Sequence, residues 1–198
     1  MLPLPFVGGP AYAIAFWCAY TLWIVLENVA SFRKRLRDKS TSRDKGSFRV
    51  IISLLWVSIG LDFALSAMAP SAAIRWERVP LFWAGVALML AGLAFRFYAM
   101  AVLGKSFTYR AAIQSDQTVV QSGPYRHIRH PSYTGALMTL LGLGLALGNW
   151  AGLLAVLGIM GAAYAYRIRV EENALMNGLG EPYKKYMQRT KRLIPFIF

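Results

Sequence analysis

Long apolar stretches alternate with short polar ones along this chain. Three of the apolar stretches are long enough to cross a hydrocarbon core of ~30 Å as helices. They cover residues 12–28, 50–69 and 80–103. Pro70 and Ser71 end the second stretch, and Pro80 suits the first turn of the third because its missing N–H is not needed there. The pattern predicts three membrane-spanning helices within residues 1–103.

A further apolar region, residues 133–166, is divided by Gly148 and Asn149, which are typical turn residues. Each half has about 15 to 17 residues, near the lower limit for a span. We therefore expect an all-α integral membrane protein with about five transmembrane helices, the last two forming a tight helical hairpin. Five glycines are expected to let the two hairpin helices approach closely: Gly142, Gly144, Gly152, Gly158 and Gly161.

Composition and charge agree with a membrane protein. The chain is 57% hydrophobic and 16% charged, whereas soluble domains carry about 25% charged residues. The net charge of +13 comes largely from the polar segments 31–49, 105–130 and 167–192. Five crossings put these segments on one side, which the positive-inside rule makes cytosolic, with the N-terminus outside and the C-terminus inside. A nucleic-acid partner is not expected, because such proteins more often show a basic face on a soluble fold.

The 198 residues predict a single membrane domain, residues 1–198. Residues 1–103 hold the three N-terminal spans and the basic cytosolic loop 31–49, and residues 104–198 hold the hairpin and a cytosolic tail. The high Ala, Gly and Leu content indicates a bacterial inner membrane.

Two ionisable residues fall inside the predicted spans, where charges are expensive and usually face the protein interior. Asp62 and Arg96 differ in depth by about 9 Å at the helical rise of 1.5 Å per residue, which argues against direct pairing. We interpret Arg96 as a candidate substrate-binding residue beside a polar head group; the alternative is a structural pair between helices. Glu27 can answer the basic loop and is left outside the site.

The sequence GPYRHIRHPSYTG at residues 123–135 leads directly into the hairpin. A basic, aromatic interfacial belt would explain Tyr125 and Arg126 individually. It does not explain two prolines and two flanking glycines, which fix the path of the backbone. After the hairpin, Arg167 and Glu171 share a helix face and can form an exposed ion pair. Adjacent acids at a helix C-terminus oppose the helix dipole, which indicates another cation for them to meet.

These motifs together resemble the isoprenylcysteine carboxyl methyltransferase family, within the wider phospholipid methyltransferase-like group. The resemblance covers residues 103–195, including Phe107, and the first two spans carry no family signal. The matching motifs are GPYRHIRHPSYTG, R-x-x-x-E-E from Arg167, G-x-x-Y-x-x-Y from Gly180 and T-x-R-x-I-P from Thr190.

The resemblance implies an enzyme that uses S-adenosyl-L-methionine, held by cytosolic loops capping the hairpin, with a lipophilic acceptor that enters from the membrane lipids. The expected cofactor-binding residues are Tyr125, Arg129, His130, Pro131, Tyr133 and Glu172. An acid, Glu171 or Glu172, can pair with the cofactor's ammonium, and Arg129 or His130 can hold its carboxylate. Tyr125 and Tyr133 offer aromatic surface to the adenine or the sulfonium. No metal site is expected, and the absence of a GxGxxG loop excludes a Rossmann-type site.

The expected catalytic residues are Arg167 and Glu171. A carboxylate acceptor, such as an isoprenylcysteine, is ionised at pH 7 and needs only a cationic clamp, for which Arg167 is the candidate beside Arg96. A lipid amine or a small thiol would instead need a base, for which Glu171 or His127 could serve. Two readings of another class remain: an NADPH-dependent lipid reductase, whose known members have more spans, and a non-catalytic scaffold that binds anionic lipid.

One spatial hypothesis underlies the enzyme reading. The polar residues before the hairpin and the two acids after it must meet in space and enclose the charged methyl donor.

Overall fold

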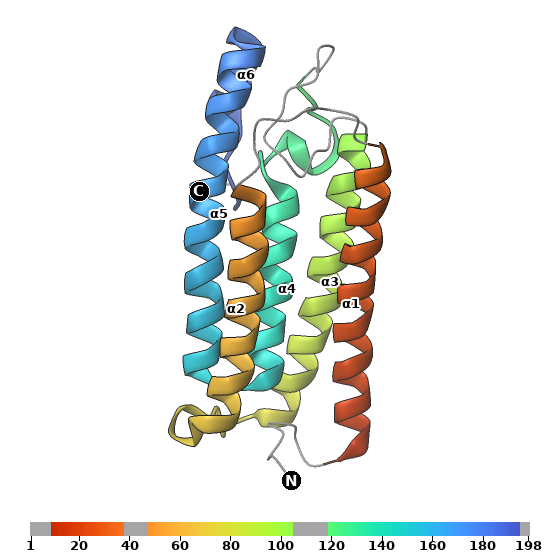
Figure 1. Ribbon diagram of the computed structural model, residues 1–198, viewed down its shortest axis with the longest axis vertical. Helices are drawn as coiled ribbons and strands as arrows, with labels where there is room; N and C mark the ends of the chain where they lie inside the picture. Colours follow the sequence, from red (N-terminus) through yellow and green to blue (C-terminus); the bar gives the residue numbers. More distant parts are fainter. Residues whose placement is uncertain (1–8, 38–46, 105–118, 195–198) are drawn as a thin grey trace.

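The computed structural model describes residues 9–37, 47–104 and 119–194. Within these residues five long helices run antiparallel in one bundle (Figure 1). They are α1 (Pro10–Arg37), α2 (Ser47–Met68), α3 (Arg78–Leu103), α4 (Pro131–Leu147) and α5 (Trp150–Leu179). The shorter elements are η1 (Pro70–Ala72), η3 (Gly123–Arg126) and α6 (Glu181–Arg189). Residues 38–46 of the expected basic loop, and Phe107, lie outside the described residues, while α1 and α2 take up the two ends of that loop.

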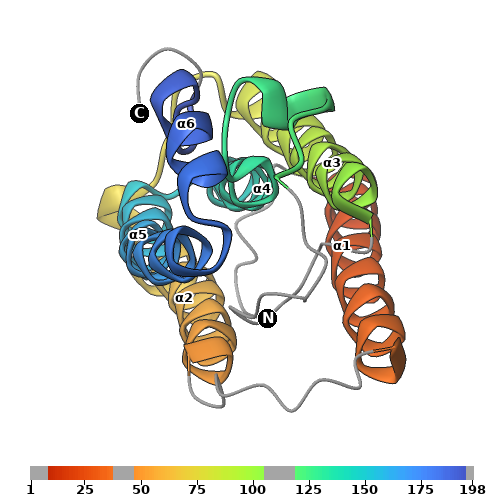
Figure 2. The ribbon, with the colours of Figure 1, turned by 90° about the horizontal axis from the view of Figure 1, so that it is seen from above.

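The expectation of an all-helical membrane protein is confirmed. Four of the helices, α1, α2, α3 and α5, are long and apolar enough to cross a membrane. The fifth, α4, has 17 residues and lies among the others when the bundle is seen end-on (Figure 2). At 1.5 Å per residue it is about 25 Å long, slightly less than a hydrocarbon core.

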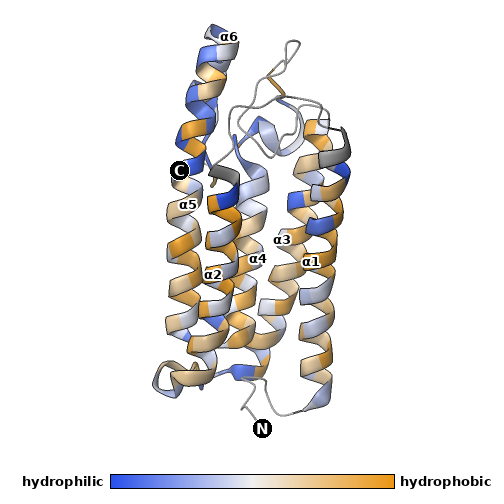
Figure 3. Cartoon of the chain, in the orientation of Figure 1, coloured by the Kyte–Doolittle hydropathy of each residue, from blue (hydrophilic) through white to orange (hydrophobic). Residues whose placement is uncertain are grey.

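The polar residues gather toward the two ends of the bundle, and its body is largely apolar (Figure 3). The end drawn uppermost in Figure 1 holds the start of α4, the end of α5 and the helix α6. The chain segments that flank the predicted hairpin on its polar side therefore lie at one end of the molecule. This is the arrangement that alternating crossings require.

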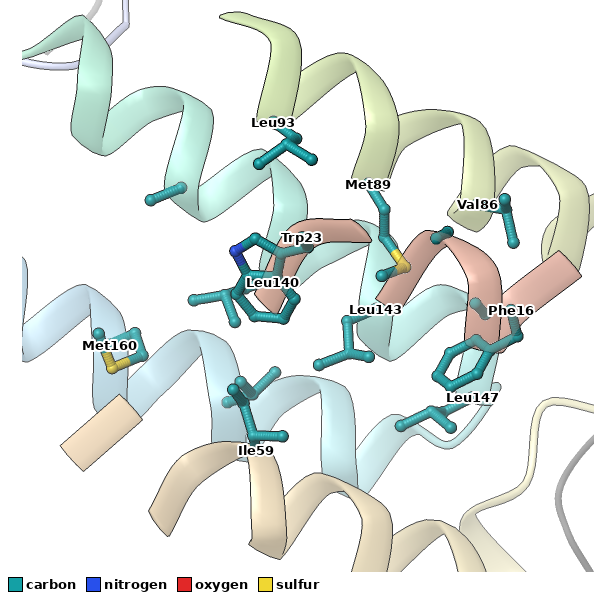
Figure 4. Close-up of a cluster of buried hydrophobic side chains, with 14 of the residues drawn as sticks. Phe16, Trp23, Ile59, Val86, Met89, Leu93, Leu140, Leu143, Leu147 and Met160 are labelled. Atoms are coloured by element: carbon teal, nitrogen blue, oxygen red, sulfur yellow. The ribbon is translucent and has the colours of Figure 1, made fainter. Parts of the chain in front are cut away.

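Side chains from all five long helices form the core (Figure 4). Phe16, Ile59, Met89, Leu143 and Met160 supply one buried contact from each helix. Large apolar side chains also cover the outside of the bundle. Such a surface is costly in water and is typical of contact with lipid.

The aromatic side chains of α1 and α2 hold these two helices together. Phe63 of α2 contacts Phe16, Trp17 and Tyr20 of α1, with ring centroids 6.0, 5.9 and 5.8 Å apart. Offset and edge-to-face aromatic pairs add about 0.5–1.5 kcal/mol each beyond their buried area. This layer joins the two helices that precede the segment with the family resemblance.

Glycines bring the backbones of α3 and α4 into contact. A Cβ atom at Gly142 would lie 2.5 Å from the Met89 backbone nitrogen, and one at Gly92 would lie 2.6 Å from that of Thr139. A Cβ at Gly135 would lie 2.7 Å from the backbone nitrogen of Arg96. Only glycine leaves room for so close an approach, so these positions set the distance between the two helices.

The expected glycine seam inside the hairpin is therefore largely wrong. Of its five members, Gly144 contacts α5, at Leu153, whereas Gly142 faces α3 and Gly152 faces Asp62 of α2. A Cβ at Gly158 or Gly161 would have nothing within 4 Å. Small residues mark a close approach, but the neighbour that approaches is a different helix from the one predicted.

The turn between α4 and α5 forms as predicted. Gly148 ends α4 with a positive φ of 68°, and the Asn149 side chain accepts hydrogen bonds from the backbone of Ala151 and Gly152. Asn149 also donates to the Ala69 carbonyl at 2.8 Å. Arg78 donates to the Ala146 and Leu147 carbonyls at 2.8 and 3.0 Å and so compensates the C-terminal dipole of α4.

Asp62 and Arg96 do not pair, as their different depths predicted. Asp62 is fully buried against Gly152, and among the described residues neither of its carboxylate oxygens has a hydrogen-bond partner. It lies toward the hairpin-turn end of the bundle, close to the start of α5. Arg96 has other partners at the opposite end.

Replacing Gly142 with alanine should destabilise the protein, because the added methyl group meets backbone rather than a movable side chain. Overpacking of this kind costs about 1–3 kcal/mol. Gly158→Ala is the matched control, since it gains the same helix propensity and meets no neighbour. Thermal unfolding in detergent should show a lower Tm for Gly142→Ala alone. Equal Tm values for the two variants would contradict the close contact between the backbones of α3 and α4.

Candidate functional site

The polar segment before α4 follows a path set by its glycine and prolines. Gly123 begins the turn η3 with a positive φ of 54°, and Pro124 is the second residue of that turn. His130 is the N-cap of α4, and Pro131 occupies its first turn, where a proline is favoured. The segment therefore delivers His130 to the point where α4 starts.

The C-terminal tail returns and pairs with this segment through backbone hydrogen bonds. Arg129 N donates to the Lys191 carbonyl at 2.7 Å, and His130 N donates to the Arg192 carbonyl at 3.0 Å. Lys191 N donates in turn to the His127 carbonyl at 3.1 Å. The Thr134 hydroxyl adds a bond of 2.7 Å to the Leu193 carbonyl. The tail is thus tied along the loop and the first turn of α4.

Two tyrosines of α6 anchor the other side of the loop. Tyr183 and Tyr186 are both buried, and the Tyr186 hydroxyl donates to the Tyr125 carbonyl at 2.7 Å. Burial raises the pKa of Tyr186 to about 12, although Arg129 and the Thr190 hydroxyl act in the opposite direction. The hydroxyl therefore stays a hydrogen-bond donor at neutral pH. The paired tyrosines of the C-terminal motif have a structural use here.

Glu172 joins three segments that are distant in the sequence. Its Oε1 accepts from Arg129 Nε at 2.7 Å, and its Oε2 accepts from Arg192 Nε at 3.0 Å. The Glu172 side chain is only 3% exposed. Arg129 also donates to the carbonyls of Met187 and Thr190. The residues before the hairpin and the acids after it therefore meet, as the central spatial hypothesis predicted.

The adjacent acid, Glu171, belongs to a second buried group. Its Oε1 accepts hydrogen bonds from the Tyr133 hydroxyl at 2.6 Å and from Arg167 Nε at 2.9 Å. Arg167 is 1% exposed. The reading of Arg167 and Glu171 as an exposed surface pair is wrong, because the hairpin and the loop cover both residues. A charge pair shielded from water interacts more strongly than one at the surface.

His130 lies between the two acids. Its Nδ1 is 3.7 Å from Glu171 Oε2, and its Nε2 is 3.5 Å from Glu172 Oε1. Nε2 is buried and has no hydrogen-bond partner of good geometry within the described residues. Buried polar atoms are normally satisfied, so this nitrogen is available to a bound ligand. Tyr133 stacks on the His130 ring, with centroids 5.7 Å apart, and Tyr164 stacks on Tyr133 at 4.8 Å.

Arg96 connects this site to α1. It donates to both carboxylate oxygens of Glu27, including Nη2 to Oε2 at 3.2 Å, and its Nη1 donates to the Ser132 carbonyl at 3.0 Å. The expectation that Glu27 only answers the basic loop is wrong. The position of Glu27 within an apolar stretch indicated a buried ion pair, but nothing in the sequence identified Arg96 as the partner.

The structure brings most of the predicted site residues together but gives Tyr125 a different setting. Arg129, His130, Pro131, Tyr133, Arg167, Glu171 and Glu172 lie in the two connected groups described above. Tyr125 is 5% exposed beneath the loop, so its ring offers little open surface to a ligand. Sequence reasoning missed the contribution of Tyr164 as a stacking partner and of Arg192 as the second cation on Glu172.

A cavity of about 560 Å³ adjoins the loop on its α6 side. Gln121, Ser122, Gly123, Arg126, Tyr186, Arg189 and Thr190 line it. None of the residues predicted to bind the cofactor is among them. Within the described ranges, no group of three or more His, Cys, Asp or Glu residues could hold a metal ion.

The fold and the site together define a polytopic membrane protein with a buried, charged site where the bundle meets the membrane surface. Residues 85–177 match the model of the Isoprenylcysteine carboxyl methyltransferase (ICMT) family. This match confirms the resemblance drawn from the motifs. Every predicted site residue lies inside the matched segment. The match begins earlier than expected, in α3, and ends before the motifs of the tail.

Several relatives of known name are similar to the chain. A protein-S-isoprenylcysteine O-methyltransferase of Schizosaccharomyces pombe is 28% identical over 158 residues, which is 79% of this chain and 61% of the relative. The protein-S-isoprenylcysteine O-methyltransferase B of Arabidopsis thaliana is 31% identical over 115 residues, 57% of this chain and 58% of the relative. The chain thus spans about three fifths of the length of these relatives.

A solved structure is also similar. It is described as the eukaryotic intramembrane Ras methyltransferase ICMT, and it superimposes with a TM-score of 0.55 at 26% sequence identity. The similarity covers 79% of this chain and 55% of that structure. It therefore extends beyond the segment that the family model matches.

Glu172→Gln should destabilise the junction between loop, hairpin and tail, because it leaves Arg129 and Arg192 without their shared counter-charge. Removing one partner of a buried pair costs about 3–5 kcal/mol. Glu181→Gln is the control, because Glu181 is 65% exposed and lies 3.9 Å from Lys184, and such pairs contribute ~0–1 kcal/mol. Glu172→Gln, unlike Glu181→Gln, should lower the Tm and speed amide exchange at residues 127–130 and 190–193. Equal amide protection in the two variants would contradict the role of Glu172 in holding the loop, α5 and the tail together.

Proposed function

We propose that this protein is an S-adenosyl-L-methionine-dependent methyltransferase that methylates a carboxylate on a lipophilic acceptor, such as an isoprenylcysteine. The observation that carries the proposal is the meeting of Arg129 and His130 with Glu171 and Glu172 inside the segment that matches the family. The names of the relatives support the reaction and the acceptor class. The proposal covers activity, acceptor and cofactor together.

The residues present fit the proposed cofactor. Its ammonium group calls for a carboxylate with a free oxygen, and Glu171 Oε2 faces only His130 Nδ1 at 3.7 Å in the contacts described. Its polar atoms also need hydrogen-bond partners. His130 Nε2 is buried and makes no hydrogen bond within the described residues, and Glu172 Oε1 lies 3.5 Å from it. When bound, the cofactor supplies an electrophilic methyl group on a sulfonium.

The contacts divide the predicted cofactor residues into two kinds. Glu172 and Arg129 already satisfy each other, so we assign them to holding the loop around the cofactor rather than to direct contact. Glu171, His130 and Tyr133 are the residues we place against it. Pro131 fixes the start of α4, and Tyr125 supports the loop from below.

The acceptor carboxylate is ionised at neutral pH and needs orientation rather than a base. Arg96 and Arg167 are buried cations beside the site that do not contact Glu172 in the contacts described, and we assign them to binding this carboxylate. Arg167 is held by Glu171, so the residue that orients the cofactor also fixes the arginine. Alignment of nucleophile, methyl group and departing sulfur then supplies much of the rate, and charges preorganised in a dry site add to it.

The lipid-facing helices support entry of the acceptor from the bilayer, and we propose that the site end of the bundle faces the cytosol. The concentration of basic residues in the segments that flank this end supports that orientation, and the N-terminus would then lie on the opposite side. Residence in a bacterial inner membrane rests on composition alone, and the relatives named above come from eukaryotes.

His130→Ala should weaken binding of S-adenosyl-L-methionine by about tenfold or more, because each lost 1.4 kcal/mol of interaction is tenfold in affinity. His127→Ala is the matched control, since His127 is exposed at the same loop. Isothermal titration of detergent-purified protein would measure both. Absence of saturable heat from the unaltered protein would contradict the proposed function, and equal affinities of the two variants would contradict the role of His130.

A further inference from the structure

Glu27 lies on α1, outside the segment 85–177 that matches the family. Its carboxylate nevertheless takes the Nε and Nη2 edge of Arg96, one oxygen to each nitrogen. The remaining terminal nitrogen, Nη1, donates to the Ser132 carbonyl. The arginine proposed to bind the acceptor therefore already holds a carboxylate from the chain itself.

Arg96 and Glu27 form a bidentate salt bridge between a guanidinium and a carboxylate. An acceptor carboxylate would seek the same edge of the same group, because that edge presents two parallel N–H donors. Two carboxylates cannot share one edge, since they repel each other and compete for the same hydrogen atoms. An acceptor carboxylate that takes this edge of Arg96 must therefore displace Glu27.

The burial of Arg96 explains why a carboxylate must pair with it when no acceptor is bound. The Arg96 side chain is 11% exposed and that of Glu27 is 22% exposed. A cation this deep is costly without a counter-charge. Glu27 supplies that charge when no acceptor is present, and it is the more exposed partner, at the outer side of the pair. Its departure would leave the bond between Arg96 and Ser132 in place.

We propose that Glu27 is an internal stand-in for the acceptor's carboxylate, which occupies Arg96 in the resting site and is displaced when a carboxylate acceptor binds. The inference rests on the proposed function, because it takes Arg96 as the residue that binds the acceptor. It makes α1, a helix without family signal, a determinant of acceptor affinity.

Glu27→Gln tests the proposal, because the amide keeps the shape and loses the charge that competes. The probes are an N-acyl S-isoprenylcysteine and its methyl ester, which differ only in the carboxylate. The variant should bind the acid about tenfold more tightly than the unaltered protein, as measured by ligand-induced shifts in Tm. It should bind the ester equally. In turnover assays KM for the acid should fall by a similar factor while kcat stays within threefold.

Other results would overturn the inference. Equal affinity of the two proteins for the acid, or tighter binding of acid and ester alike, would show that Glu27 does not compete. A fall in kcat with KM unchanged would show that Glu27 only positions Arg96.

The binding readout separates this inference from the proposed function. Tighter binding of the acid alone, with no methyl transfer by either protein, would retain the stand-in and contradict the methyltransferase. If Glu27→Gln does not fold, amide exchange on the unaltered protein serves instead. The acid but not the ester should then speed exchange in the last described turns of α1, and identical exchange with both ligands would overturn the proposal.

Discussion

The Glu172 carboxylate, placed between Arg129 and Arg192, is the interaction on which the site depends. It connects the loop before α4, the C-terminal part of α5 and the returning tail, three segments that are far apart in the sequence. A guanidinium shielded from water without a counter-charge is costly, so the loop with Arg129 and the tail with Arg192 both need the acid that α5 supplies. When these three segments are fixed, Glu171 and His130 face each other beside Tyr133. We propose that a ligand with a positive and a negative group binds there.

The packing of α4 connects that junction to the rest of the bundle. Glycines on α3 and α4 let the two backbones touch, and the contact brings Arg96 of α3 to the carbonyl of Ser132 in the first turn of α4. His130 caps the same turn. A shift of α3 against α4 would therefore move Arg96, which we propose binds the acceptor, relative to His130, which we propose binds the cofactor. Close helix packing thus has a direct consequence for the geometry of the site.

Much of this arrangement could be predicted from the sequence, and for identifiable reasons. The bilayer demands apolar stretches of a certain length, so the five long helices and the turn at Gly148 and Asn149 follow from pattern alone. The order of motifs around the hairpin predicted that the polar residues before it and the acids after it would meet, but not that Arg129 would bind Glu172 directly. The partners of small and charged residues inside the spans could not be predicted in this way. Gly142 signals a close approach without saying which helix approaches, and Glu27 signals a buried charge without naming Arg96. The tail pairs with the loop through backbone atoms, which leave no signature in the side chains.

The central claim is that the buried network serves methyl transfer to a carboxylate. Its most direct test is to incubate membranes that contain the protein with methyl-labelled S-adenosyl-L-methionine, extract the lipophilic fraction and treat it with mild base. A methyl ester releases its label as methanol under these conditions, whereas a methylated amine or thioether keeps it. The account predicts a lipophilic product that appears only with the protein and releases labelled methanol. Label that stays bound after base would contradict the carboxylate acceptor, and no protein-dependent label at all would contradict the enzyme.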